Sequence, residues 1–521
     1  MMTPADADLT LPSVLAALGD TPAGLDLMLT IIFHPDTSRI GYKSIVPLQK
    51  GTDPWVLGRN SPTFKGGTGL ASKALEDLHV SRAALQFVYQ KKRLMVRRFD
   101  SASRCCIGST EVQDSVELGW DKLLKGVPIM LAHSIVLMLR LAKRRAIQMP
   151  LGGQGNALRG GSACIEDIHQ QVAHAAKSDV DVMIRGETGT GKELVATAIH
   201  RASGRADAPM VSVNMAAIPS ELAAAALFGS SRGAFTGADR ATLGYFEQAQ
   251  GGSLFLDEIG EASLEVQPLL LRALQQREIQ VVGGVIKRID VRVISATDAA
   301  LDAVGCDFKA ALRHRLGAFE IVLPPLREHP EDIGELLLYF LQGSAAEAQR
   351  SEVLPQAQST ERDIAAWALL FFRFVSYSWP GNVRELANFA RQIILASEKN
   401  LTLNDHLYSA LFSSSGTPHT ADSSTARRKI DDIDDAAFEQ AMVSNGCEAL
   451  RVALQLGVSR SAVYRRIKTS IRYRLATDIP LDELQSMLAQ HDGDSITVAR
   501  QLQVSVKSLR CHLRNLHLLY T

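Results

Sequence analysis

The chain has 521 residues, of which 46% are hydrophobic and 21% are charged. Such a chain can bury sizeable cores, and its length predicts roughly three or four domains. Its 56 lysine and arginine residues balance 56 aspartate and glutamate residues, which excludes a global charge that would favour nucleic acid or a membrane. The six cysteines show neither the paired spacing of a zinc site nor the density of a disulfide scaffold, as expected in a reducing compartment. We find no signal peptide and no membrane span, and we expect a cytoplasmic protein without a membrane partner.

The first predicted domain covers residues 28–142, where short β-rich runs are separated by glycine, serine and lysine turns. This pattern predicts an all-β sandwich. The clearest runs are Ile45–Leu48, Ala84–Tyr89, Arg93–Arg98 and Ile129–Leu139. The segment 143–161 turns basic and then glycine-rich, which is typical of a linker.

The central region alternates apolar strands with amphipathic helices over residues 162–326, which predicts a parallel α/β sheet covered on both faces. Residues 327–410 have helical apolar spacing and predict a small helical lid on that α/β core. A flexible tether is expected at 411–426, because serine, threonine and alanine dominate there.

The C-terminal region is predicted to be all-α, with two related segments at 427–475 and 478–521. The sequence VALQLGVS at 452–459 returns as VARQLQVS at 498–505. In each copy a turn is expected between two short helices. The fold class is therefore multidomain: an all-β sandwich, an α/β core with a helical lid, and a tandem helix-turn-helix.

A glycine-rich loop with the sequence GETGTGK follows the strand Val182–Ile184 and opens a helix, as a phosphate-binding loop requires. Its backbone amides would point at the phosphates of ATP, and Lys192 would add a positive charge. Glu193 stands where most such loops carry Ser or Thr, which removes one usual Mg²⁺ ligand. The nucleotide-binding candidates of the loop are Gly186, Glu187, Thr188, Gly189, Thr190, Gly191, Lys192 and Glu193.

Two carboxylates end the apolar strand Ser253–Leu256, about 65 residues after the loop. On the same sheet, Asp257 would coordinate Mg²⁺ and Glu258 would polarise the attacking water. The sequence therefore predicts an enzyme that hydrolyses ATP with Mg²⁺ as its metal.

Five motifs in a fixed order make the resemblance specific: GETGTGKE, GAFTGA, GGSLFLDEIG, LPPLRE and WPGNVREL. Residues from about 162 to 410 resemble the AAA+ domain of bacterial enhancer-binding proteins, the activators of sigma-54 RNA polymerase. The resemblance implies a homo-hexamer that spends ATP hydrolysis on remodelling the closed complex of the sigma-54 holoenzyme. It also implies that a loop contacts sigma-54 through Gly233, Ala234, Phe235, Thr236, Gly237 and Ala238.

The same resemblance assigns roles to three further residues. Asn214 corresponds to the asparagine that restrains the water-polarising glutamate. Arg384 corresponds to the lid arginine that touches nucleotide, although a solvated salt bridge is the alternative. Arg315 corresponds to an arginine finger that reaches the γ-phosphate of the neighbouring subunit, and such fingers contribute about 10³ to 10⁵ in rate.

The chain departs from the family pattern at three places. Lys309 replaces an arginine of the finger region, and lysine lacks the planar fork of arginine. Asp298 replaces the sensor asparagine that belongs to the nucleotide site, and Ser230 and Ser231 replace the His-Glu pair before the GAFTGA loop. Lys309 and Asp298 prompt a rival hypothesis, a DNA-bound phosphopeptide-sensing adaptor or repressor with an impaired ATPase. A third hypothesis is a protein-unfolding or clamp-loading AAA+ enzyme, but this hypothesis does not explain the presence of the GAFTGA sequence.

The first C-terminal segment places a helix, a glycine turn, a serine cap and a second helix in helix-turn-helix order, and resembles the Fis-type module of enhancer-binding proteins. Residues 451–474 hold seven basic and no acidic side chains, which suits the phosphates of upstream enhancer DNA. The second copy either contacts DNA or mediates dimerisation. The DNA-binding candidates are Ser459, Arg460, Ser461, Tyr464, Arg465, Arg466, Lys507 and Arg510.

The N-terminal region, with Trp55–Arg59 followed by Val80–Arg82 and a run of strands, resembles a forkhead-associated domain. The resemblance implies that Arg59, Ser81 and Arg82 grip the phosphate of a phosphothreonine protein through charge-assisted hydrogen bonds. Ala84 stands where this family commonly has histidine. The alternative is therefore a domain that only docks onto the ATPase or represses it.

Overall fold

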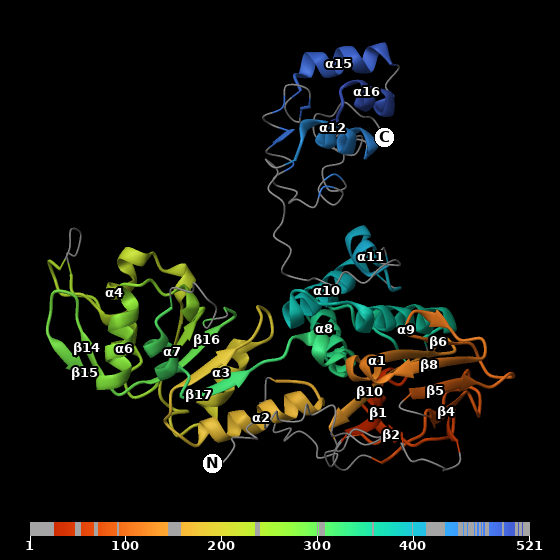
Figure 1. The fold of residues 1–521 in the computed structure, drawn as a ribbon, viewed down its shortest axis with the longest axis horizontal. Helices are drawn as coiled ribbons and strands as arrows, with labels where there is room; N and C mark the ends of the chain where they lie inside the picture. Colours follow the sequence, from red (N-terminus) through yellow and green to blue (C-terminus); the bar gives the residue numbers. More distant parts are fainter. Residues whose placement is uncertain are drawn as a thin grey trace, which may run out of the picture. The chain divides into compact units, whose positions relative to one another are not determined.

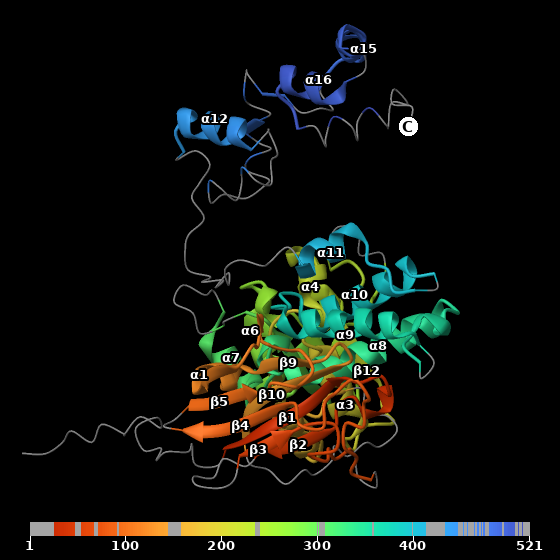
Figure 2. The same cartoon turned by 90° about the vertical axis from the view of Figure 1, so that its right-hand side faces the viewer.

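The computed structural model describes residues 25–46, 54–66, 71–90, 93–143, 158–234, 240–299, 301, 308–356, 359–398, 400–412 and 433–445, and a discontinuous set between 452 and 513. The chain divides into two compact units, residues 1–415 and 416–521 (Figures 1 and 2). Among the described helices, none has the length and apolar character that crossing a membrane requires.

The N-terminal region forms two antiparallel sheets in the described residues, with strand orders β2-β1-β10-β9-β6-β7 and β3-β4-β5-β8. Leu29 of β1 and Phe87 of β4 belong to one buried apolar cluster that both sheets share, which confirms that the region is β-rich. Its elements are β1 Leu25–Phe33, β2 Lys43–Val46, β3 Trp55–Leu57, β4 Leu85–Gln90, β5 Arg93–Arg98, β6 Cys105–Ile107, β7 Thr110–Glu111, β8 Ser115–Gly119, α1 Trp120–Lys125, β9 Val127–Leu131 and β10 Ile135–Lys143. The predicted run Ile129–Leu139 contains parts of two strands, because the turn at 132–134 divides it into a hairpin.

The central domain holds a parallel sheet with the order β12-β13-β16-β11-β17, and helices cover both of its faces. Along β11, Val182 and Ile184 pack with α2 and α3 on one face, whereas Met183 packs into the cluster of α4, α6 and α7 on the other. This double burial confirms the predicted α/β core. The strands are β11 Val182–Arg185, β12 Met210–Asn214, β13 Ser253–Asp257, β16 Arg292–Thr297 and β17 Phe319–Val322, with a hairpin of β14 Glu278–Gln280 and β15 Ile286–Arg288. The helices are α2 Ala163–Ala176, α3 Lys192–Arg201, α4 Ser220–Phe228, α5 Tyr245–Gln248, α6 Val266–Gln276 and α7 Ala310–Leu316, with 3₁₀ turns at Met215–Ala217 and Ile259–Glu261.

The helical lid follows the sheet and is built around large aromatic side chains. Trp379 is fully buried, and its ring lies 5.1 Å from that of Phe374 and 5.6 Å from that of Phe389. Aromatic side chains therefore fill the space between the helices of the lid. Its helices are α8 Ile333–Glu347, α9 Glu361–Ser376, α10 Asn382–Ala396 and α11 Asp405–Phe412.

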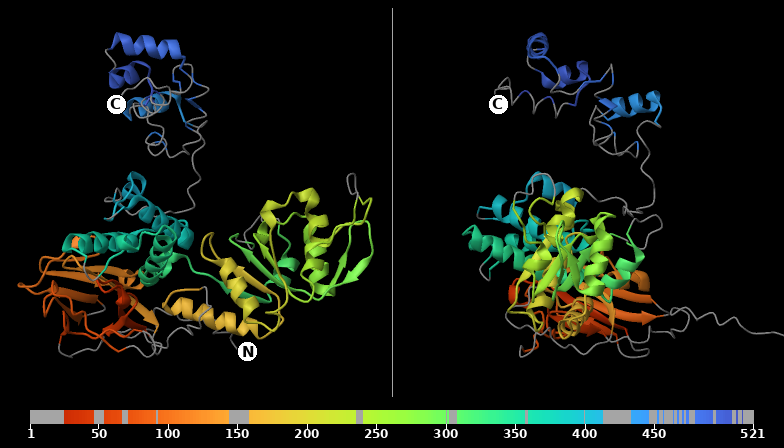
Figure 3. Two further views of the ribbon diagram at one scale, coloured as in Figure 1. Left: turned by 180° about the vertical axis from the view of Figure 1, so that it is seen from behind. Right: turned by 90° about the vertical axis from the view of Figure 1, so that its left-hand side faces the viewer.

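The sandwich packs directly against this lid (Figure 3). Ile32 and Phe33 of β1 belong to the same buried cluster as α8, α9 and α10, and the Phe33 ring lies 4.9 Å from that of Phe371. A Cβ on Gly334 would lie 2.5 Å from the carbonyl oxygen of Ile32, so the close approach of α8 to β1 requires glycine. The two domains therefore share one apolar core.

The C-terminal unit contains two small apolar cores at corresponding places of the sequence repeat. Val452, Val463 and Ile467 are buried in the first core, and residues 46 positions later (498 minus 452, 509 minus 463, 513 minus 467) are buried in the second. Gln503, where the first copy has Gly457, has a φ of 52°, in the left-handed region that favours glycine. The described helices are α12 Asp435–Ser444, α15 Leu481–Gln490 and α16 Ser495–Gln501.

We predict that Phe33→Ala weakens the lid as well as the sandwich. The substitution removes a fully buried ring from the shared core, and such truncations cost about 3–5 kcal/mol of unfolding free energy. Phe64→Ala is the matched control, because Phe64 is equally buried but lies in the core of the sandwich alone. Limited proteolysis is expected to cut the lid faster in Phe33→Ala than in Phe64→Ala. Equal protection of the lid in both variants would contradict a shared core.

Candidate ATPase site

The phosphate-loop candidate connects β11 to α3. Gly189 and Gly191 have φ values of 83° and 100°, so both need the left-handed region that glycine tolerates. The Thr190 hydroxyl donates to the carbonyl oxygen of Glu187 at 2.8 Å and closes the loop on itself. Since Gly191 caps α3, the N-terminus of that helix points at the space inside the loop.

Lys192 lies at the base of this loop and is largely buried. Its Nζ donates to the carbonyl oxygen of Gly186 at 3.0 Å and lies 3.8 Å from Oε1 of Glu258. The Thr188 hydroxyl donates to Asp298 Oδ2 at 2.7 Å. The loop is therefore bounded by carboxylates that follow β13 and β16, because parallel strands end at the same edge of a sheet.

The carboxylates at this edge differ in their readiness to ionise. Burial raises the pKa of Glu258, and the neighbouring carboxylates of Asp298 and Asp257 raise it further against the opposing charge of Lys192. The hydrogen bond from the Thr188 hydroxyl lowers the pKa of Asp298, so this residue carries a negative charge beside the loop. A carboxylate with a raised pKa is a stronger base, as the polarisation of a water molecule requires.

The lid contacts the phosphate loop through a buried asparagine that sequence reasoning did not single out. Asn382 Nδ2 donates to Glu187 Oε2 and to the carbonyl oxygen of Thr188, both at 3.1 Å. Its Oδ1 accepts from the backbone N–H of Leu326 at 2.9 Å. Arg327 adds two hydrogen bonds to the carboxylate of Glu187. Asn382 lies in the motif WPGNVREL and Arg327 lies in LPPLRE. From the sequence, these motifs indicated the family resemblance but not a contact between these two residues and the loop.

The predicted lid arginine, Arg384, is exposed near the loop. Its backbone N–H donates to the carbonyl oxygen of Gly189 at 3.2 Å. A Cβ on Gly189 would lie 2.4 Å from the carbonyl oxygen of Gly381 and 3.2 Å from Cβ of Arg384. The start of α10 therefore approaches the loop so closely that the loop tolerates only glycine at this position.

Asn214 and Arg315 hold hydrogen bonds within their own surroundings. Asn214 lies opposite Asp257 in the β12–β13 register, and its Oδ1 accepts from the backbone N–H of Ala216 at 2.9 Å. Arg315 on α7 donates through Nη2 to the carbonyl oxygen of Leu274 at 2.9 Å and through Nε at 3.3 Å. The assigned roles of both residues remain predictions.

The GAFTGA loop is described only at its base, since Phe235, Thr236, Gly237 and Ala238 lie outside the described residues. Ser230 and Thr242 exchange two backbone hydrogen bonds across the neck of the loop, and their hydroxyls lie 2.8 Å apart. Both the backbone N–H and the hydroxyl of Ser231 donate to the carbonyl oxygen of Val282 at 3.0 Å. Ser230 therefore joins the two flanks of the neck, and Ser231 fixes the neck to the turn between β14 and β15. Gly233 and Ala234 follow this neck.

The three phosphopeptide candidates lie together at one end of the sandwich. Arg59 donates through its backbone N–H to the carbonyl oxygen of Ser81 at 3.0 Å and through Nε to that of Val80 at 3.0 Å. The Ser81 hydroxyl accepts from the backbone N–H of Ser103 at 2.9 Å, and Arg82 is exposed. Arg59 thus supports the loop that carries Ser81, and phosphopeptide binding remains a prediction.

Most of the DNA-binding candidates lie outside the described residues: Ser459, Arg460, Ser461, Tyr464, Arg465, Lys507 and Arg510. Arg466 is described, and its Nη2 donates to Asp435 Oδ1 at 2.6 Å while its guanidinium stacks on Phe438. In this structure Arg466 therefore ties its own helix to α12.

Comparison with known families identifies the two central regions. The sigma-54 interaction domain matches residues 158–322, and the AAA+ ATPase lid domain matches residues 327–424. These matches confirm the predicted AAA+ ATPase with its helical lid.

Among known proteins, the chain is 46% identical over 252 residues to the DNA-binding transcriptional activator HyfR of Escherichia coli, covering 47% of this chain but only 35% of HyfR. It is 36% identical over 362 residues to the DNA-binding transcriptional regulator NtrC of a Bradyrhizobium strain, covering 69% of each protein. A solved structure of NtrX from Brucella abortus in complex with ATP is 28% identical and matches with a TM-score of 0.43, over 60% of this chain and 69% of that one.

We predict that Asp298→Asn tightens ATP binding but lowers the hydrolysis rate at saturating ATP, because Glu258 loses a neighbouring charge that raises its pKa. The carboxylate of Asp298 lies against Thr188 of the phosphate loop, and removing one negative charge there is worth roughly 1–2 kcal/mol, or about tenfold in affinity. Isothermal titration and steady-state hydrolysis measure the two effects. The control is Asp207→Asn, which removes the same charge at an exposed position. An Asp298→Asn protein that binds ATP no more tightly than this control would refute the electrostatic role.

Proposed function

Because the chain belongs to the NtrC family of sigma-54-dependent transcriptional activators, we propose that it binds enhancer DNA upstream of a promoter and uses ATP hydrolysis to remodel closed complexes of sigma-54 RNA polymerase. The observation that carries this proposal is the connection between the ATPase site and the neck of the GAFTGA loop. The Ser230–Ser231 flank of the neck is joined, within one α/β domain, to the ends of two neighbouring strands: β12, which ends at Asn214, and β13, which is followed by Glu258.

The chain makes that connection along two routes. From Asn214 at the end of β12 it passes through α4 to Ser230 at the neck. From Glu258 after β13 it passes through α6 and β14 to Val282, which accepts both hydrogen bonds from Ser231. The helices α4 and α6 pack in one buried cluster. A displacement of the strand ends on hydrolysis would therefore be carried to the loop that presents Phe235 and Thr236.

The ATPase site has the residues that ATP with Mg²⁺ requires. The backbone amides of 186–191 and the Lys192 ammonium would hold the phosphates, with Arg384 of the lid beside them. Mg²⁺ prefers oxygen ligands, and the Asp257 carboxylate at the strand end fits it, with phosphate oxygens and water completing the shell. The ion would neutralise phosphate charge. Glu258 would polarise the attacking water.

The arginine finger supports a closed ring, and the family implies that this ring is a homo-hexamer. Arg315 would leave the carbonyl oxygen of Leu274 and reach the γ-phosphate bound by the next subunit, which requires a head-to-tail interface that closes into a ring. The repeated C-terminal cores support a DNA-binding module with two copies of its fold unit. The sandwich would serve as the regulatory domain, through phosphothreonine binding at Arg59, Ser81 and Arg82.

A second candidate function is a DNA-bound adaptor or repressor with an impaired ATPase. It is favoured by the hydrogen bond between Thr188 and Asp298, which places a negative charge beside the phosphate loop, and by Lys309 at the start of α7. Steady-state hydrolysis separates the two functions. A wild-type rate equal to that of Lys192→Ala supports the adaptor, and a higher rate supports the activator.

We predict that Thr236→Ala abolishes transcription from a sigma-54 promoter in vitro while ATPase activity stays within about twofold of wild type. The substitution alters the loop tip that would contact sigma-54 and leaves the nucleotide site intact. The contact with sigma-54 is therefore expected to weaken while ATP hydrolysis continues. Thr110→Ala, in an exposed strand of the sandwich, is the matched control. Transcription equal to that of this control would refute the role of the loop.

We predict that Arg315→Ala lowers hydrolysis by about 10³ because the transition state loses its finger. Mixing Arg315→Ala with Lys192→Ala subunits tests where the finger acts. In a ring, an intact Arg315 from one variant completes the intact phosphate loop of the other, so roughly a quarter of wild-type activity returns on random mixing. A mixture no more active than its components, or monomers alone in mass photometry with a nucleotide analogue, would contradict the ring.

A further inference from the structure

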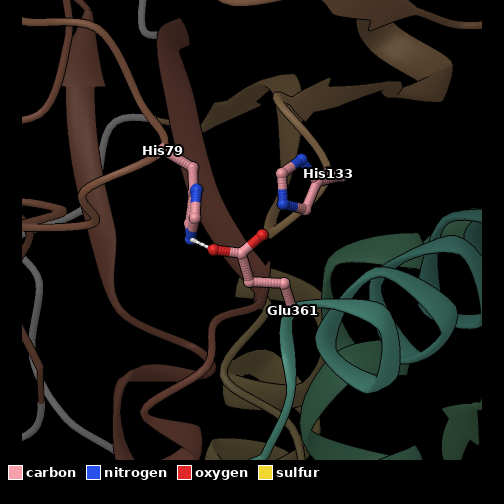
Figure 4. A group of neighbouring side chains, drawn as sticks. All are labelled: His79, His133 and Glu361. Carbon is pink, nitrogen blue, oxygen red and sulfur yellow. Dashed lines mark ion pairs between the residues drawn. The ribbon is translucent and has the colours of Figure 1, made fainter.

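A cluster of two histidines and a glutamate lies where the sandwich meets the lid (Figure 4). His79 precedes Val80 in a sandwich loop, His133 lies in the turn between β9 and β10, and Glu361 is the first residue of α9. The candidate ligand atoms of the three side chains all lie within 4.8 Å of one another. His79 Nε2 lies 3.8 Å from Glu361 Oε1, and the two imidazole rings are 4.8 Å apart.

The two histidine-bearing loops are joined beneath the cluster by one carboxylate. Asp77 Oδ1 accepts from the backbone N–H of His79 at 2.8 Å and from the hydroxyl of Ser134, next to His133, at 3.0 Å. Asp77 and Ser134 are both buried. The Ser103 hydroxyl also donates to the carbonyl oxygen of His79 at 2.6 Å. The backbone on which the histidines stand is therefore fixed without any ion.

The third side chain is placed by the start of a long helix. The Thr360 hydroxyl caps α9 by accepting from the backbone N–H of Asp363, which fixes where Glu361 leaves the helix. The Glu361 side chain is 75% exposed and that of His79 is 32% exposed. An ion can therefore reach the cluster from solvent, and the side chains can rotate onto it.

We propose that His79, His133 and Glu361 bind a zinc ion, with water as the fourth ligand. Two imidazole nitrogens and one carboxylate oxygen form a donor set that Zn²⁺ takes in tetrahedral sites with one open position. Hard cations such as Mg²⁺ and Ca²⁺ prefer all-oxygen sites, so the histidines select against them. The ion would draw the three ligand atoms together to about 2.0–2.2 Å from its centre.

The three ligands come from two different domains. His79 and His133 belong to the sandwich, and Glu361 belongs to the lid, so a bound ion joins the two domains across their interface. His79 also lies two residues before Ser81, in the loop that Arg59 supports. Zinc would therefore stabilise the docked sandwich and the loop at its end.

A second group of potential ligands, Cys164, His329 and Asp332, provides an internal control. His329 Nδ1 and Asp332 Oδ2 already share a hydrogen bond of 2.8 Å, and Asp332 Oδ1 accepts from the backbone N–H of Ser162. These ligand atoms hold the structure together without an ion. We expect the Cys164→Ser protein to bind zinc as tightly as the wild type does.

The test is zinc binding to the full-length protein. Titration against a chromophoric chelator measures the affinity, and the visible absorption of Co²⁺ reports a four-coordinate site. We expect one ion per chain, a rise in the melting temperature with ZnCl₂, and loss of both in His79→Ala and His133→Ala. Since even outer-shell changes cost about 10–100-fold in affinity, removal of a direct ligand is expected to cost at least about 100-fold.

Glu361→Gln is the decisive variant, because the side chain is exposed and its replacement keeps the shape. It is expected to weaken zinc binding and to remove the increase in melting temperature. His174→Ala, which removes an exposed histidine of α2, is the matched control and is expected to bind as wild type. Zinc binding that survives in His79→Ala and His133→Ala, that is lost in Cys164→Ser, or that is absent from the wild type would overturn the proposal.

Discussion

The hydrogen bonds of Asn382 hold together the parts on which the ATPase site depends. This fully buried side chain accepts from Leu326, where the sheet passes into the lid, and donates to Glu187 and Thr188 of the phosphate loop. Its backbone φ of 51° lies in the left-handed region, which asparagine tolerates better than most residues. An unsatisfied buried amide costs about 1–3 kcal/mol, so the lid cannot leave the loop without a replacement for these bonds.

The lid contacts both the phosphate loop and the sandwich. The start of α10 lies on the phosphate loop, while α8 and α9 share an apolar core with the sandwich. The sandwich is also tied to the lid by an ion pair of 2.5 Å between Arg140 and Glu331, both largely buried. Because apolar burial and a paired buried charge are both lost on separation, the sandwich is expected to move with the lid. A displacement of the sandwich is therefore expected to reach the phosphate loop through the lid.

Sequence reasoning predicted the elements that local patterns determine. The strand, loop and helix around Lys192 follow from glycine spacing and apolar runs, and the buried strands of the sheet follow from continuous hydrophobic segments. The corresponding buried residues of the C-terminal repeat, such as Val463 and Leu509, follow from an offset visible in the sequence.

The contacts between domains could not be predicted in this way. Asn382 contacts a loop almost 200 residues earlier, and its motif gives no sign of that partner. Phe33 reads as an ordinary strand residue, yet it packs on Phe371 of the lid. His79, His133 and Glu361 lie far apart in the sequence and share no metal-binding spacing. Only long-range packing brings such residues together, and periodicity carries no information about it.

Asp298, one of the departures from the family pattern, lies among the charged side chains around the phosphate loop. Asp298 is held ionised by the Thr188 hydroxyl, and it lies near a Glu258 whose pKa burial already raises. Lys192 is the positive side chain within ion-pair distance of Glu258 among the described residues. Phosphates bound in the loop would compete with these carboxylates for the charge of Lys192. An asparagine at position 298 would relieve that competition. We therefore expect Asp298 to weaken nucleotide binding while it keeps the pKa of Glu258 raised.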